Sequence, residues 1–234
     1  MASTPTLLNS EAFTTNATSY TTTSWAYTPS TSVLELVCVW VCDDGGGSPA
    51  PTLSGCGMTW NTYTDGTTSA NVLGTGSRVR SRIYRAVSGT PSSGDLTIST
   101  GAVTCERAGI ALISISETTP GNAVQIVTGS GSSTSPSVTL AAVADSANLI
   151  LGVVSNRNPV STFTVGSGFT SLVSTSIESD LRVSVEYSTN DTTVDGTLGS
   201  SGNWTMIGVE IDNVPAAAGS VPAIVASYRR RRAL

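Results

Sequence analysis

The sequence predicts an all-β protein with a jelly-roll-like β-sandwich fold, built from two similar halves and carrying extended terminal arms. Three observations lead to this prediction: the composition, a succession of short strand-like segments, and an internal repeat. Roughly three residues in ten are Ser or Thr, only 12% are charged and 23 are Gly, which favours strands and turns over helices. At 234 residues the chain is long enough to bury the core of one large or two small domains.

Twelve segments are expected to be strands, because each is short, rich in β-branched and aromatic residues, and bounded by Gly, Pro, Asn, Asp or Ser. No stretch has the period of an amphipathic helix. Regularly spaced short strands are typical of sandwiches and barrels. In chain order the segments are SWAYT, VLELVCVWV, MTWNTYT, RVRSRIYRAV, DLTIST, AGIALISIS, AVQIVTG, SVTLAAV, LILGVVS, FTSLVSTS, LRVSVEYST and NWTMIGVEI.

The internal repeat is seen when residues 24–41 are set over residues 139–156, which align without a gap at an offset of 115 positions. Four more segment pairs follow in the same order. Such self-similarity indicates a structural duplication. The pairs are PTLSGCGMTW with FTVGSGFTSL, SRVRSRIYRAV with SDLRVSVEYST, GDLTIST with DGTLGSS, and RAGIALISIS with NWTMIGVEI.

The junction between the repeats, SETTPGNAVQIVTGSG, has neither a Pro-rich linker nor a charge run. We therefore expect one sandwich in which each half supplies strands to both sheets. Two small immunoglobulin-like sandwiches in tandem are the alternative. The expected division is an N-terminal arm over 1–12, a sandwich over 13–214 with half-repeats 13–117 and 118–214, and a C-terminal arm over 215–234.

The residue inventory excludes several kinds of catalysis. The chain has no His and no Lys, so Ser-His-Asp and Cys-His catalysis, His-ligated zinc, Schiff bases and Walker-type phosphate loops are excluded. Glu210 and Asp212 share a strand face near the end of the chain, which is the minimum for two-carboxylate glycoside cleavage. We expect them instead to be solvated carboxylates at a strand end, and we expect no enzyme and no cofactor.

Metal sites are also not expected. Calcium needs six to eight oxygen ligands, and the acidic stretches Asp43-Asp44 and Asn190-Asp191 with Asp195 supply only a few, so turn formation is the simpler interpretation. Cys38 and Cys42 share a strand face about 13 Å apart, too far for a disulfide. We expect reduced, buried thiols. A disulfide involving Cys56 or Cys105, and a metal, are the alternatives.

Charge is distributed unevenly along the chain. The net charge is −5, but four of the 11 basic residues stand together near the C-terminus, so the remainder has seven Arg against 16 acidic residues, a net −9. An acidic body is a poor general binder of nucleic acid, so nucleic acid is not an expected partner. The N-terminus has no secretory signal pattern and no apolar run approaches about 18 residues. We expect a protein made and folded in a cytoplasm, with no membrane span.

Two sets of side chains in the body are candidates for binding. Arg78, Arg80 and Arg82 lie on one face of a strand, with Val79, Ser81 and Ile83 on the other. The arginines are expected either to blunt a solvent-facing sheet surface or to pair with carboxylates of a neighbouring subunit. Trp60 and Tyr63 are the aromatic residues most expected to reach a surface, where they could stack on a glycan, although core packing is the simpler reading. Trp40 shares a face with Leu36 and Cys38, which indicates core.

The C-terminal segment combines a linker-like AAAGSVP, an apolar AIVASY and four arginines. Either it is a solubilising end, or it is an arm that adds a strand to a partner's sheet edge and is held there by its arginines on an acidic patch. In the second case the contacts are made by Tyr228, Arg229, Arg230, Arg231 and Arg232.

From about Phe13 to Val214 the chain resembles a β-sandwich domain of phage virion proteins and bacterial surface proteins. The segments AGIALISIS, ETTP, TGSGSSTSPSVTL, SANLILGVV, TVGSGFTSL and NWTMIGVEI carry the resemblance, in that order. It implies a fold and a particle-surface setting, not a chemistry. We expect a non-enzymatic virion protein, most specifically a capsid decoration (cement) protein that contacts the major capsid protein or another virion protein as a homo-oligomer, with a trimer as the guess. The alternatives are a phage tail or fibre component and a carbohydrate-binding adhesion module.

Overall fold

The computed structural model describes residues 4–42, 49–74, 76, 78–116, 121–157 and 161–212. Within these ranges the chain consists of antiparallel strands, turns and loops and contains no α-helix. The sheets pack face to face, so the predicted all-β sandwich class is confirmed.

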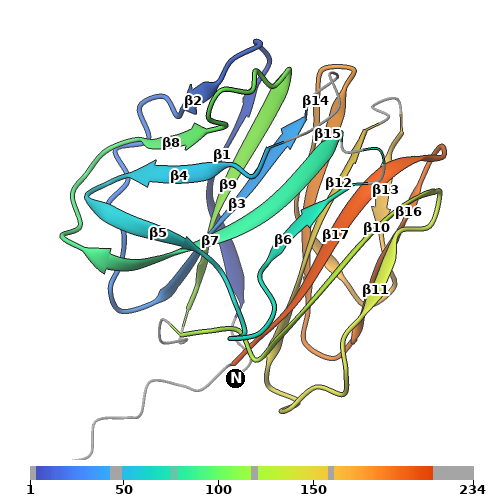
Figure 1. The fold of residues 1–234 in the computed structure, drawn as a ribbon. Helices are drawn as coiled ribbons and strands as arrows, with labels where there is room; N and C mark the ends of the chain where they lie inside the picture. Colours follow the sequence, from blue (N-terminus) through green and yellow to red (C-terminus); the bar gives the residue numbers. More distant parts are fainter. Residues whose placement is uncertain are drawn as a thin grey trace, which may run out of the picture.

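Nine strands between residues 5 and 115 form half 1 of the molecule (Figure 1). Its large sheet has the strand order β1-β9-β3-β7-β5, with β6 paired to β7, and its small sheet has the order β2-β8-β4. The strands are β1 (Pro5–Phe13), β2 (Ser19–Thr21), β3 (Leu34–Cys42), β4 (Thr52–Gly55), β5 (Met58–Thr62), β6 (Asn71–Leu73), β7 (Val79–Gly89), β8 (Leu96–Ser99) and β9 (Arg107–Ile115).

Eight strands between residues 125 and 211 form half 2. Its large sheet has the order β10-β17-β12-β15-β14 and its small sheet the order β11-β16-β13. The strands are β10 (Gln125–Ser133), β11 (Ser137–Thr139), β12 (Leu149–Arg157), β13 (Phe163–Val165), β14 (Thr170–Ile177), β15 (Leu181–Ser188), β16 (Thr193–Leu198) and β17 (Gly202–Ile211).

The two halves have the same topology, strand for strand, once β6 is set aside as an addition to half 1. In each, the first strand pairs with the last and the second pairs with the last but one, which is the wrapped pattern of a jelly roll. The 115-residue offset read from the sequence joins equivalent positions, since β3 begins at Leu34 and β12 at Leu149. The change between the halves falls after Ile115 and before Gln125, where the sequence placed it.

The expected sharing of sheets between halves is wrong. Each sheet takes its strands from one half only, so the molecule is two jelly rolls packed side by side through their large sheets (Figure 1). The physical reason lies in β3 and β12, which are buried on both faces. One face of each packs on the small sheet of its own half and the other packs on the opposite half.

Two local predictions also need correction. Residues 1–12 were expected to be an arm, but from Pro5 onwards they belong to β1, which pairs with β9 along its whole length. SWAYT was expected to be a strand, but it is a loop with one isolated bridge at Tyr27. Ser24 and Ala26 both have positive φ, which interrupts an extended conformation.

Strand β1 serves two cores because of a β-bulge at Leu8. Before the bulge, Leu7 lies opposite Ile113 and packs towards half 2. After it, Phe13 lies opposite Ala108 and packs towards the small sheet of half 1. The extra residue, Leu8, is left 47% exposed, as expected where one residue is inserted into a ladder.

Candidate functional site: the seam and its edge strands

The most extensive internal surface is the contact between the two large sheets, which we call the seam. Strand β7 lies on β12 and β17, while β1 and β9 lie on β14. The seam is an apolar core in its own right, and burial of its side chains stabilises the contact between the two halves. Its buried side chains include Leu34, Leu36, Cys38, Trp40 and Ile83 from half 1, and Leu149, Leu151, Val153, Val183 and Val209 from half 2.

A glycine on β9 sets how closely the halves approach. A Cβ added to Gly109 would lie 2.9 Å from Ile177 Cδ1 of half 2 and 3.5 Å from Cε3 of Trp40. Ile177 therefore fills the space that a side chain at 109 would take. Placing a small residue opposite a large one in this way lets protein interiors reach their high packing density.

Three hydroxyl groups bond to one another across the seam. Ser81 of half 1 lies 2.9 Å from Ser155 and 2.5 Å from Thr205 of half 2, and the last two are 2.5 Å apart. All three residues are buried. Because each hydroxyl can donate one bond and accept others, the triangle satisfies itself without water. The triangle links β7 of half 1 to β12 and β17 of half 2. It can form only when the two sheets are aligned so that these three residues meet.

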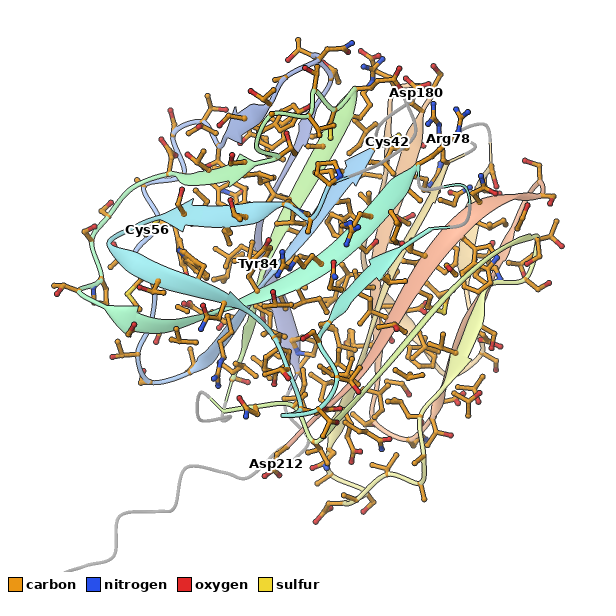
Figure 2. All side chains as sticks on the ribbon, in the orientation of Figure 1. Cys42, Cys56, Arg78, Tyr84, Asp180 and Asp212 are labelled. Atoms are coloured by element: carbon orange, nitrogen blue, oxygen red, sulfur yellow. The ribbon has the colours of Figure 1, made fainter. Side chains whose placement is uncertain are left out.

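Ion pairs cross the seam at the end where Cys42, Arg78 and Asp180 lie (Figure 2). Arg107 of half 1 contacts Glu178 at 2.6 Å and Asp180 at 2.9 Å, and Arg157 of half 2 contacts Glu106 at 3.4 Å. Each is partly exposed, so each contributes little to stability. They join β9 to the turn between β14 and β15, and the end of β12 to the residue before β9.

Two strand edges flank a groove along one side of the seam. Among the described residues β1 pairs only with β9 and β14 only with β15, so both have an unpaired edge. Between them lies a cavity of about 150 Å³. Unpaired edges are the part of a sheet that can accept a strand from a partner. The cavity is lined by Ser10, Glu11, Ala12, Trp40, Ile110, Ala111, Val173, Thr175, Ile177 and Val183.

The arginine row is placed as predicted on one face of β7, but it is not a solvated row. Arg82 donates to Thr62 Oγ1 and to the carbonyl of Pro51, at 2.7 Å, and Arg80 donates to Asn71 Oδ1 at 3.1 Å. Both side chains are half-buried, and only Arg78, just before the strand, is exposed. The small sheet and the loop around Pro51 cover part of this face, which a single strand cannot reveal.

The two aromatic residues proposed for glycan stacking are buried. Trp60 is 7% exposed, packs in half 1 between its two sheets and donates its indole N–H to the carbonyl of Gly55. Tyr63 is 1% exposed and lies in the seam. The core packing that was the simpler reading of both residues is therefore confirmed, and the carbohydrate-binding alternative loses the residues it rested on. Trp40 is in the seam core with Leu36 and Cys38, as predicted.

The carboxylates near the end of β17 differ from expectation. Glu210 was expected to be solvated, but it is buried and accepts hydrogen bonds from Ala144 N, Asn148 Nδ2 and Gln125 Nε2. Asp212 is exposed. Glu210 thus holds the loop before β12 and is not free for acid–base chemistry.

Half 1 performs the same task with a different residue. Glu35 on β3 is also buried and accepts from Tyr27 Oη and Ser30 N, in the loop before β3. In the duplicated register Glu35 corresponds to Ile150, the neighbour of Glu210 across the ladder. A carboxylate therefore occupies nearly the same place in both halves while coming from different strands. Because the two carboxylates come from different strands, aligning the repeats does not show that they are equivalent.

The remaining candidate ligands are the acidic residues of the turns and the four cysteines. Asp191 accepts from Thr193 N, which is the turn chemistry that was expected. Within the described ranges no group of three or more Cys, Asp or Glu side chains is arranged to hold a metal ion. All four cysteines are buried and free, as predicted, and burial raises the pKa of Cys42 to about 12. The Asp43-Asp44 stretch, Tyr228 and Arg229–Arg232 lie outside the described residues.

Sequence reasoning missed Glu186. On β15 the residues Leu181, Val183 and Val185 alternate with Arg182, Ser184 and Glu186, a pattern that by itself does not show that the second set is buried. Glu186 is in fact fully buried between the two sheets of half 2. The only available signal was its alignment with Tyr84 of half 1, which is a core residue.

Comparisons with known families, proteins and structures found nothing similar to this chain. No family model matches it, and searches of curated proteins and of solved structures give no significant match. No helix among the described residues has the length and apolar character to cross a membrane.

Proposed function

We propose that the protein is a non-enzymatic structural component of a virus particle, most specifically a decoration protein that binds and stabilises a phage head shell. The observation that carries the proposal is the seam. Two jelly rolls joined by a shared core, a hydroxyl triangle and cross-seam ion pairs form one four-layer block. A block of this kind suits a protein that bears load.

The unpaired strand edges of this block support the same role in a virus particle. Strands β1 and β14 present unpaired edges on either side of the 150 Å³ cavity. A neighbouring chain or shell protein can extend either sheet by strand addition, which supplies main-chain hydrogen bonds. Repetition of such contacts in a symmetric homo-oligomer, for which a trimer is the guess, raises the avidity for the shell.

The first test is the copy number of this protein in purified virus particles from its source, measured by quantitative mass spectrometry against the major shell protein. A copy number comparable to that of the shell protein is the expected result. A small fraction of that number instead indicates a tail or fibre component. Complete absence from the particles contradicts a role in the virion.

The arginine-rich segment is proposed to strengthen attachment to the shell. Deleting Arg229–Leu234 should leave the fold intact and weaken decoration, with the larger loss at low salt, because high salt already screens the contacts of the four charges in the intact chain. The measurement is the occupancy of undecorated shells by the intact and the shortened chain at low and high salt. Equal occupancy by both chains under both conditions removes the proposed role of the arginines.

A further inference from the structure

Glu186 is a buried carboxyl group without a partner. Its exposure is 0%, and neither carboxylate oxygen has a hydrogen-bond partner. Burial, and then the nearby charge of Asp195, raises its pKa to about 8. A buried carboxyl is stable in such a place only while it is neutral, because an ionised one costs several kcal/mol without a cation or donors.

Half 1 has no such group at the equivalent position. In the duplicated ladders Tyr84 lies opposite Val37, and Glu186 lies opposite Gly152. The hydroxyl of Tyr84 donates to the carbonyl of Pro51, and burial raises the pKa of Tyr84 to about 12. The same position in the fold is therefore insensitive to pH in half 1 and sensitive in half 2.

The space around Glu186 is closed by direct contact between the two sheets of half 2. Gly208, Gly152 and Glu186 lie in one row across β17, β12 and β15. Val194 of the small sheet packs onto both glycines, and a Cβ on Gly152 would lie 2.5 Å from Val194 Cγ1. Val194 on β16 therefore covers this row of the large sheet.

Among the described residues, no cation contacts the carboxyl group from the elements packed around it. Asp195, next to Val194 on β16, is the charged group that acts on Glu186, and it raises the pKa further. Strands β13 and β14 carry no charged residue. The other charged groups of these elements are Arg157 on β12, Arg182 on β15, Asp191 before β16 and Glu210 on β17.

These other groups form hydrogen bonds or ion pairs with residues other than Glu186. Arg182 donates to Ser174 and Ser176, and Arg157 contacts Glu106 of half 1. Glu210 accepts three hydrogen bonds of its own. Ionised Glu186 would therefore face only Asp195, which is also negative.

We propose that Glu186 makes half 2 a proton-dependent module. While Glu186 is neutral the small sheet β11-β16-β13 stays closed on the large sheet, and ionisation at alkaline pH opens it to water while half 1 stays closed. The seam remains intact, because it lies on the opposite face of β12 and β15 from Glu186. This device does not depend on the proposed virion role.

The test is hydrogen–deuterium exchange of the full chain, corrected for the intrinsic pH dependence of exchange and compared between about pH 6 and about pH 9. Peptides covering β13 and β16 should gain exchange, by up to about tenfold per pH unit until the pH reaches about 8 and with a plateau above it, whereas those covering β4 and β8 should not. Glu186→Gln should abolish the gain. Tyr84→Phe, the matched change in half 1, should leave it unchanged.

Equal responses of both halves, or a response that persists in Glu186→Gln, overturn the proposal. If Glu186→Gln does not fold, the carboxyl carbon of Glu186 in the unmodified protein is titrated by NMR. A midpoint well above that of an ordinary glutamate, with half 2 amides responding at the same pH, supports the proposal. A midpoint in the ordinary range for glutamate, near pH 4.3, overturns it.

Discussion

At the scale of single residues, the molecule depends on a few positions where one side chain's size or charge decides the packing. Gly109 lets Ile177 of the other half enter the seam. Ser81, Ser155 and Thr205 satisfy one another in an otherwise apolar surface. Glu186 is buried without a partner. Each of these positions acts through what faces it from a distant part of the chain.

Replacing Gly109 by Val should destabilise the protein by about 1–3 kcal/mol, the usual cost of inserting a side chain into a filled core. The reason is that the new Cβ would lie 2.9 Å from Ile177 Cδ1. The free energy of unfolding is measured by urea titration. Gly94→Val is the matched control, because a Cβ at Gly94 meets nothing within 4 Å. Equal costs for the two changes would show that the seam tolerates the extra volume.

The stability of the protein should depend on pH through Glu186. Its pKa is raised from 4.5 to about 8 in the folded state, so between these values the folded protein binds more protons than the unfolded chain. The free energy of unfolding therefore falls as the pH rises through this window, by up to about 1.4 kcal/mol per unit. Below the window this contribution to stability is complete, and above it the contribution is lost.

Urea titrations of the unmodified protein and of Glu186→Gln, repeated across this pH range, isolate that contribution. The difference between the two free energies should change with pH in the stated direction. Two profiles that stay parallel would mean that Glu186 does not carry the predicted proton.

At the scale of elements, the strands that matter most pack on two sides. Strands β3 and β12 are buried on both faces and connect the seam to the small sheets. Strand β1 achieves a similar result by another route, since the bulge at Leu8 turns Leu7 towards the seam and Phe13 towards the small sheet.

Deleting Leu8 should destabilise the protein by about 1–2 kcal/mol, because a shift of one residue moves Leu7 and Pro5 to the opposite face of β1. Replacing Leu8 by Ser should change little, since the side chain is largely exposed. Chemical denaturation of both variants checks this. A deletion variant as stable as the Ser variant would show that the bulge has no packing role.

At the scale of the whole molecule, the seam makes two topologically complete jelly rolls depend on each other. Each half has its own internal core, but each also has a large sheet whose second face is apolar. An exposed apolar face of this size is a typical cause of association or aggregation. The acidic charge and the absence of lysine affect the solubility of the protein and its choice of partners, whereas the seam affects its stability.

Producing residues 1–118 and 119–212 as separate chains should give two fragments that are poorly soluble alone and that combine on mixing into a one-to-one complex. The expected cause is burial of the apolar seam. Size-exclusion chromatography with light scattering measures the result. Two fragments that remain monomeric, soluble and unassociated would show that the halves are independent domains.

The sequence alone determined the all-β class, the duplication and its 115-residue offset, the core position of Trp40 and the buried state of the cysteines. These follow from local pattern, since strand period, turn residues and repeat order need no knowledge of what lies across a sheet. The tertiary structure decided what covers each strand face. It placed Tyr63 in the seam, Trp60 beneath a small sheet, and Glu186 and Glu210 in the interior. Alternation along a strand distinguishes its two faces, but the burial of a face depends on strands distant in sequence, which only the folded chain brings into contact.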